Sequence, residues 1–188
     1  AQTSNKEGVF ASTGRLQAQS PRVRGVNIGY PITVDYNVHG NLNDETVQIL
    51  KANLNLGKTP IEVKGQVNAK PTPAVIDLNL AASNASLPEA ARLAAAFGVA
   101  FNSDTKADGV LDLNIHAQGP ADKPAMNGQA AARNLLISGG DLPQPVRVDR
   151  MDLSLSPATI QSNRFTATTG GTNVQAQFTL SDYTSTSP

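Results

Sequence analysis

Apolar and polar residues alternate with a period of two along much of this chain of 188 residues. Residues 32–39, 61–69 and 111–118 each place an apolar side chain at every second position. Side chains on a β-strand point to alternate faces, so each segment is predicted to be a strand with one apolar and one polar face. Turns rich in Gly, Pro and Asn separate further predicted strands near residues 15–19, 22–28, 46–56, 75–82, 129–137, 146–155, 165–169 and 173–180.

The alternation changes parity inside two of these strands. Apolar residues move from odd to even numbers after Ile49, and from even to odd numbers after Val148. One extra residue in a strand flips the face of all that follow, so both places are predicted to be β-bulges that increase curvature. The expected fold is mainly β: one domain over residues 1–188, built as a long curved antiparallel sheet.

One segment predicts a helix instead. Ser86 and Glu89 have the spacing of a capping box, in which each residue bonds the backbone N–H of the other. An alanine-rich run follows, and Gly98 suits a helix end, so a short helix is expected near residues 88–97. Residues 102–108 are expected to form a polar loop, and the polar ends 1–13 and 183–188 are expected to be flexible.

Composition narrows the class of partner. Hydrophobic residues make up 39% of the chain and aromatic residues only 4%, so the apolar surface is thin and aliphatic. Fifteen basic residues balance fifteen acidic ones without clustering, which argues against a nucleic-acid partner. The absence of cysteine excludes disulfides and thiolate metal sites. No apolar run is long enough for a membrane-spanning helix, so we expect any membrane anchor to lie outside these residues.

Residues suited to catalysis are scarce. His39 and His116 lie on the polar face of predicted strands, without a second ligand at metal-binding spacing, and are interpreted as surface residues. Asp35, Asp77 and Asp112 also lie on polar faces, where solvated charge or edge protection is the usual role. The paired glycines lack the flanking residues of a phosphate loop, and no nucleophile elbow is present. We therefore expect neither an enzyme nor a bound metal or cofactor.

The pattern of Gly and Pro in the turns between strands resembles that of a known family. Residues 108–128 run from a strand through Gly119, a short turn with Pro124, and Gly128 into another strand. This unit resembles the recurring unit of AsmA-like proteins of the bacterial cell envelope, and residues 73–101 and 143–183 resemble the C-terminal part of that family. The family is similar to TamB and to bridge-like lipid-transfer proteins, whose curled sheet forms a groove with an apolar floor. The resemblance therefore implies that the curved sheet of this chain has a groove or half-barrel form, β-taco-like. An N-terminal membrane helix anchors its members, which are implicated in phospholipid transport and outer-membrane homeostasis.

The resemblance implies a periplasmic fragment of a longer chain that is anchored in the inner membrane. We expect the apolar face to bind or conduct lipid acyl chains, such as those of phospholipids. The alternative is a sheet that fills its own core and serves as a structural spacer or protein-interaction module. Open sheet edges are also expected to allow association between copies. The lipid-contact candidates are in-facing residues of four predicted strands: Val34, Tyr36, Val38, Ile61, Val63, Val67, Ile76, Leu78, Leu80, Leu111, Leu113 and Ile115.

Overall fold

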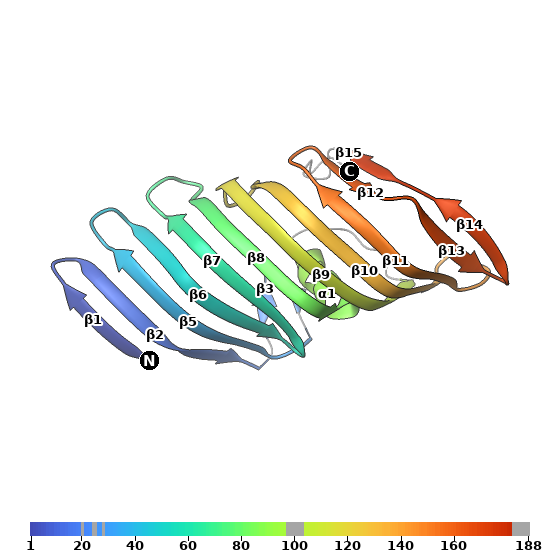
Figure 1. Cartoon of the computed structure of the whole chain (residues 1–188). Coiled ribbons are helices and arrows are strands. Elements are labelled where there is room, and N and C mark those ends of the chain that lie inside the picture. The colour runs from blue at the N-terminus through green and yellow to red at the C-terminus, as the bar shows by residue number, and fades with distance from the viewer. Residues whose placement is uncertain (20, 24–25, 28, 97–103, 182–188) are drawn as a thin grey trace.

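The computed structural model describes residues 1–19, 21–23, 26–27, 29–96 and 104–181. Within these residues, thirteen strands form one open antiparallel sheet, and one short helix lies behind it (Figure 1). The expected long antiparallel sheet with a short helix is confirmed. The strands are β1 (Gln2–Lys6), β2 (Val9–Ala18), β5 (Ile32–Asn41), β6 (Thr46–Leu56), β7 (Thr59–Asn68), β8 (Val75–Ser86), β9 (Thr105–Pro120), β10 (Ala125–Gly139), β11 (Val146–Leu155), β12 (Thr159–Ser162), β13 (Phe165–Thr169), β14 (Thr172–Ala176) and β15 (Thr179–Ser181).

Strands follow one another across the sheet in chain order from β1 to β11, apart from a separate two-stranded piece. That piece pairs β3 (Arg22–Val23) with β4 (Val26–Asn27), where the sequence predicts one continuous strand. Beyond β11 the sheet divides, because β12 pairs with one part of β11 and β13 with another. The sheet therefore ends on one side at β1 and on the other at β14 and β15.

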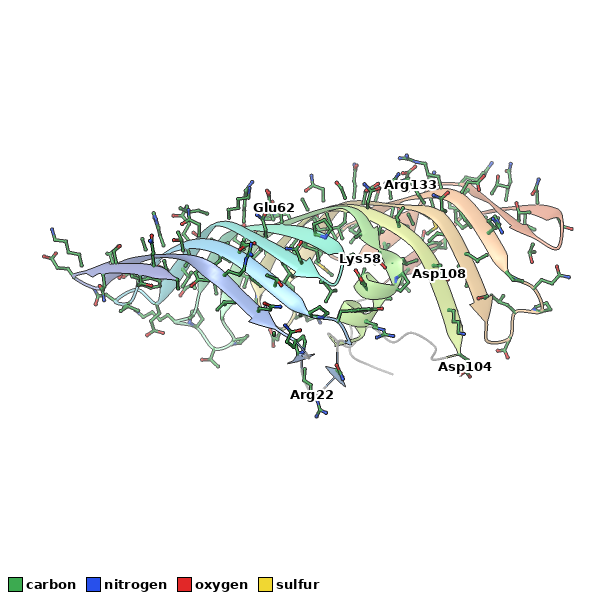
Figure 2. The ribbon with its side chains drawn as sticks, turned by 90° about the horizontal axis from the view of Figure 1, so that it is seen from below. Arg22, Lys58, Glu62, Asp104, Asp108 and Arg133 are labelled. Carbon is green, nitrogen blue, oxygen red and sulfur yellow. The ribbon has the colours of Figure 1, made fainter. Side chains whose placement is uncertain are left out.

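Register assigns every strand the two faces that its alternation predicts. Leu80 of β8 lies opposite Val63 of β7 and Ile115 of β9, whereas the adjacent Asn79 lies opposite Lys64 and His116. Directly opposed residues of antiparallel strands share a face, so from β2 onward one side of the sheet is mainly apolar and the other mainly polar. We call them the apolar face and the polar face. Figure 2 shows the helix on one side of the sheet and Glu62 and Arg133 of the polar face on the other.

Three irregularities bend the ladder. The parity change after Ile49 is a bulge of β6 against both neighbours, as predicted. The change after Val148 has a different origin, because β11 stays in register with β10, and the shift lies between β10 and β9. Asn134 of β10 has a φ of 52° there. A third bulge, in β8 between Ala82 and Ala85, was not predicted, because the alanine-rich sequence has little apolar contrast.

The helix α1 (Leu87–Ala96) follows β8 directly and packs against β8 and β9. It matches the expected helix near 88–97, of which residue 97 lies outside the described residues. Its first turn differs from the predicted capping box. The N–H of Ser86 donates to Thr59 Oγ1 at 2.8 Å, and the Glu89 carboxylate is directed to the β6–β7 turn instead of back to Ser86.

Glu89 fastens the helix to that turn. Its carboxylate is buried and accepts hydrogen bonds from the Thr59 hydroxyl at 2.5 Å and the Lys58 N–H at 3.2 Å. Gly57 of the same turn has a φ of 59°, and a Cβ at this residue would collide with Glu89 Oε1. Glycine therefore provides both the backbone conformation and the space for the carboxylate. Leu56 and Thr59, on either side, are fully buried.

Three further sequence predictions are corrected. Residues 1–13 were expected to be flexible, but residues 2–6 and 9–13 lie in β1 and β2, whose hairpin turns at Glu7 and Gly8, both with positive φ. Residues 105–108 of the expected loop begin β9, because they pair with β10 beyond its bulge. The expected final strand 173–180 divides into β14 and β15, since Phe178 bonds Ser162 at the break. The end 183–188 lies outside the described residues.

Replacing Glu89 with Ala is expected to lower the free energy of unfolding by about 1–3 kcal/mol, because the Thr59 hydroxyl and Lys58 N–H lose their buried acceptor. Urea denaturation followed by circular dichroism measures this loss. Glu89→Gln keeps one acceptor oxygen and should lose less stability. Equal denaturation midpoints for wild type and Glu89→Ala would contradict this role.

Candidate functional site

The predicted lipid-contact residues all lie on the apolar face. Pairing connects them across five consecutive strands, from Val34 on β5 through Leu54 on β6 and Ile61 on β7 to Ala82 and Leu113 on β8 and β9. The same registers place the other candidates in neighbouring rows of this face: Tyr36, Val38, Val63, Val67, Ile76, Leu78, Leu80, Leu111 and Ile115. The structure thus brings together on one surface residues that are up to 81 positions apart in the chain, from Val34 to Ile115.

This surface is only partly covered. Of the predicted lipid-contact residues, Ile61 is buried, and the others are half-buried. In the described part of the chain, the buried hydrophobic residues lie between β6 and β11, and β2 and β5 contribute none. These buried hydrophobic residues are Leu56, Ile61, Ala82, Ala85, Ala117, Ala132, Leu135 and Val148, and half of them are alanines.

The helix covers one part of the apolar face. Leu87, at the start of α1, packs on the buried cluster of Ala132, Leu135 and Val148, which joins β10 to β11. Farther along α1, the Arg92 guanidinium lies 4.8 Å from the ring centre of Tyr30, the residue before the Pro31 that leads into β5. Among the described residues, the ten-residue helix packs mainly against β8 and β9, and every predicted lipid-contact residue except Ile61 remains half-buried.

The apolar face extends farther than the sequence-based candidates. Leu153 and Leu155 of β11 continue its rows through Ala130 and Gly128 of β10, and Ile160 of β12 extends them again. Phe10 and Leu16 of β2 lie on the same face next to β5. The alternation of these strands was visible in the sequence, but their faces could be joined to the others only through the register.

Cross-strand ion pairs cover the polar face. Asp35, Asp77 and Asp112, interpreted from the sequence as solvated charges, each bind a basic residue of an adjacent strand. The partners are Arg15 at 2.6 Å, His116 at 2.7 Å and Arg133 at 2.6 Å. Glu62 binds Lys64 of its own strand, β7, at 2.5 Å. The pairs that join adjacent strands oppose slippage, because a shifted register would separate the partners.

Hydrogen bonding lowers the pKa of three of these carboxyl groups. The Arg15 guanidinium lowers the pKa of Asp35, and the Lys64 ammonium lowers the pKa of Glu62. The pKa of Asp112 is lowered chiefly by the backbone N–H of Asn84, which donates to it at 2.8 Å, and further by Arg133. The ionised carboxylate of Asp112 on β9 thus binds the backbone of Asn84 in the bulge of β8.

The polar face has a shallow depression whose charged side chains are bound in ion pairs. A depression of about 600 Å³ lies over β8 to β11, and the polar groups that line it include Asp112, Arg150 and Asp152. Arg150 and Asp152 bind each other at 2.6 Å, and Asp112 is bound to Arg133. Within the described residues, no three His, Asp or Glu side chains lie close enough to hold a metal ion. No helix in the described part of the chain has the length and hydropathy that a membrane span requires.

Comparison with known proteins adds no further evidence: no family model, curated protein or solved structure matches this chain.

Acid should weaken the fold partly through Asp112. Because its pKa is lower in the folded protein, the stability it contributes is present above the unfolded pKa of about 3.9 and is lost as pH falls through the lower folded value. We expect Asp112→Asn to be less stable than wild type at neutral pH, and the difference to shrink below about pH 4. Urea denaturation at a series of pH values measures it.

Arg133→Gln is the matched comparison for this prediction. It should reduce the acid sensitivity less than Asp112→Asn does, because the Asn84 N–H is the larger cause of the lowered pKa. Parallel stability curves for wild type and Asp112→Asn down to acid pH would show that Asp112 plays no such part.

Proposed function

We propose that this chain is a β-groove module of the bacterial cell envelope that binds or conducts lipid acyl chains along its apolar face. The observation that carries the proposal is the open sheet, whose apolar face remains half-buried from β5 to β9 while α1 covers only part of it. A continuous apolar surface of this extent is unusual for a protein without a partner.

The chemistry of this face suits an acyl chain. Its side chains are aliphatic along β7 to β9, with Ile61, Val63, Leu78 and Leu80 in adjacent rows, and its register brings no charged residue among them. Each methylene that leaves water against such a surface contributes about 0.8 kcal/mol. A lipid chain can therefore act as the missing layer of the core without any specific polar contact.

The width of the apolar face also matches the length of a lipid acyl chain. Five neighbouring strands spaced about 4.8 Å apart span roughly 19 Å, and one leaflet of a bilayer's hydrocarbon core is roughly 15 Å thick. An acyl chain that lies across β5 to β9 would therefore remain in contact with apolar side chains over its length. Movement from strand to strand would change its contacts little, because the rows of the face repeat.

Resemblance supports the cellular setting. The unit in residues 108–128 is similar to that of AsmA-like envelope proteins. On this proposal the chain is a periplasmic part of a longer protein that is anchored in the inner membrane, and its role is phospholipid transport or outer-membrane homeostasis. No catalytic residues are assigned, because the proposed work is binding.

Leu78→Asn tests the proposal on a single row. Leu78 is half-buried between Gly65 of β7 and Ala117 of β9, so an amide there lies on the apolar face within reach of water. We expect wild type to bind a fluorescent fatty acid, and Leu78→Asn to bind it about tenfold more weakly or worse, a loss of ~1.4 kcal/mol. Fluorescence titration measures the affinity.

Asn79→Ala is the matched control, because Asn79 is on the polar face of the same strand. It should change neither binding nor stability. Absence of acyl binding by wild type would refute the lipid proposal and favour a structural spacer. The same conclusion follows if Leu78→Asn loses several kcal/mol of stability, as a packed core residue would, and still binds the probe.

A further inference from the structure

The two ends of the sheet are unlike. At β1, the residues on the apolar face are Thr3 and Asn5, which lie opposite Ser12 and Phe10 of β2. Lys6 and Glu7 add charge at the same edge. Polar side chains and charge at an edge strand are the usual protection against pairing with another chain. The apolar face therefore stops at β1.

The opposite edge, formed by β14 and β15, lacks this protection. Residues 165–181 contain no Asp, Glu, Lys, Arg or Pro. Val174 lies opposite Ala167, which pairs with the buried Val148, and Leu180 lies opposite Ile160. Val174 and Leu180 thus extend the apolar face to the outermost strands, where they are 47% and 50% exposed. Figure 1 shows β14 at the outer edge, farthest from β1.

The hairpin fixes which backbone groups of β14 face outward. Gly170 and Gly171 form its two-residue turn, with φ values of 55° and 78°, and Thr169 and Thr172 flank it. Residues that flank such a turn exchange hydrogen bonds, and hydrogen-bonded pairs recur at every second position. Thr172, Val174 and Ala176 therefore bond toward β13. The N–H and C=O groups of Asn173 and Gln175 point away from the sheet.

We propose that β14 is a strand-pairing site for a second copy of this chain. The two β14 strands run antiparallel about a two-fold axis through Val174. Asn173 then lies opposite Gln175 of the partner subunit, and these are the residues whose backbone groups face outward. Val174 meets Val174 of the partner subunit in the non-bonded position between them, where opposed side chains approach most closely.

Self-complementarity selects a second copy over another partner. Residues 165–181 carry no charge, so no like charges oppose each other along the two paired β14 strands, and one register satisfies the outward groups of both strands. A two-fold axis normal to the sheet also keeps both apolar faces on the same side, which makes them continuous. Because five-residue strands bury less surface than a standard interface, the dimer is weak and depends on concentration. The proposal does not require lipid binding.

Proline substitution at matched positions of the two edges tests the proposal. Gln175→Pro removes an outward N–H of β14 and leaves the hydrogen bonds to β13 intact. Asn5→Pro removes an outward N–H of β1 and leaves the hydrogen bonds to β2 intact, because the β1–β2 hairpin also turns on two residues with positive φ. Analytical ultracentrifugation of wild type should show a monomer–dimer equilibrium. Gln175→Pro should weaken it about tenfold or more, and Asn5→Pro should leave it unchanged.

Several results would overturn the proposal. They are a wild type that is monomeric up to about 1 mM, a Gln175→Pro variant that dimerises normally, or loss of dimer in Asn5→Pro. Circular dichroism checks that each variant is folded.

Cysteine cross-linking gives an independent measurement, because the chain has no cysteine. In Val174→Cys the two thiols meet across the axis, and Cα atoms of a non-bonded pair, about 4.5 Å apart, are within disulfide range. Val9→Cys, on the β2 strand near the other edge and 54% exposed, controls for chance collisions. Under mild oxidation, Val174→Cys should form covalent dimers faster than Val9→Cys. Equal rates would overturn the proposal even if Gln175→Pro failed to fold.

Discussion

The rest of this structure depends on an excess of apolar strand surface over anything in the described residues to cover it. Period-two alternation gives each strand one face that avoids water, and antiparallel register aligns these faces into a single surface. Closed barrels and sandwiches remove such a surface by covering it with more sheet. Here the sheet stays open, and one short helix lies on it. The lipid proposal follows from this imbalance, whereas the strand-pairing proposal rests on the open edge at β14.

Polar interactions hold this shape in place where hydrophobic burial is weak. Glu89 holds the start of α1 against the β6–β7 turn, and Gly57 leaves room for its carboxylate. On the opposite face, the pairs that include Arg15 with Asp35 and Arg133 with Asp112 mark the register. Exposed pairs of this kind contribute little stability individually. Their value lies in specifying alignment, since the aliphatic rows on the other face would tolerate a slip of two residues.

Local sequence patterns predicted strands, faces and the helix well, because each depends on neighbours within a few residues. Parity within each strand placed Val63, Leu80 and Ile115 on the apolar face, and the structure shows that they lie opposite one another. Long-range pairing was beyond such patterns. The carboxylate of Glu89 accepts a hydrogen bond from a threonine thirty residues away in the chain. The bulge lies between β10 and β9, but β11 stays in register with β10, so the apolar positions of β11 change parity as well. The first strands were missed because residues 1–13 are polar, and the β1–β2 hairpin shows itself only through backbone pairing.

Chain order across the sheet has a consequence for folding and for evolution. From β6 to β10 each strand pairs only with the strands that come directly before and after it in the chain. Stability in such an array is close to a sum of nearest-neighbour terms, as in repeat proteins, and pairing can start at any hairpin and spread in both directions. Duplication or loss of one hairpin would then change the length of the sheet without rearranging the remainder. A gene that encodes this meander could lengthen by whole hairpins, each new pair of strands adding about 10 Å to the surface.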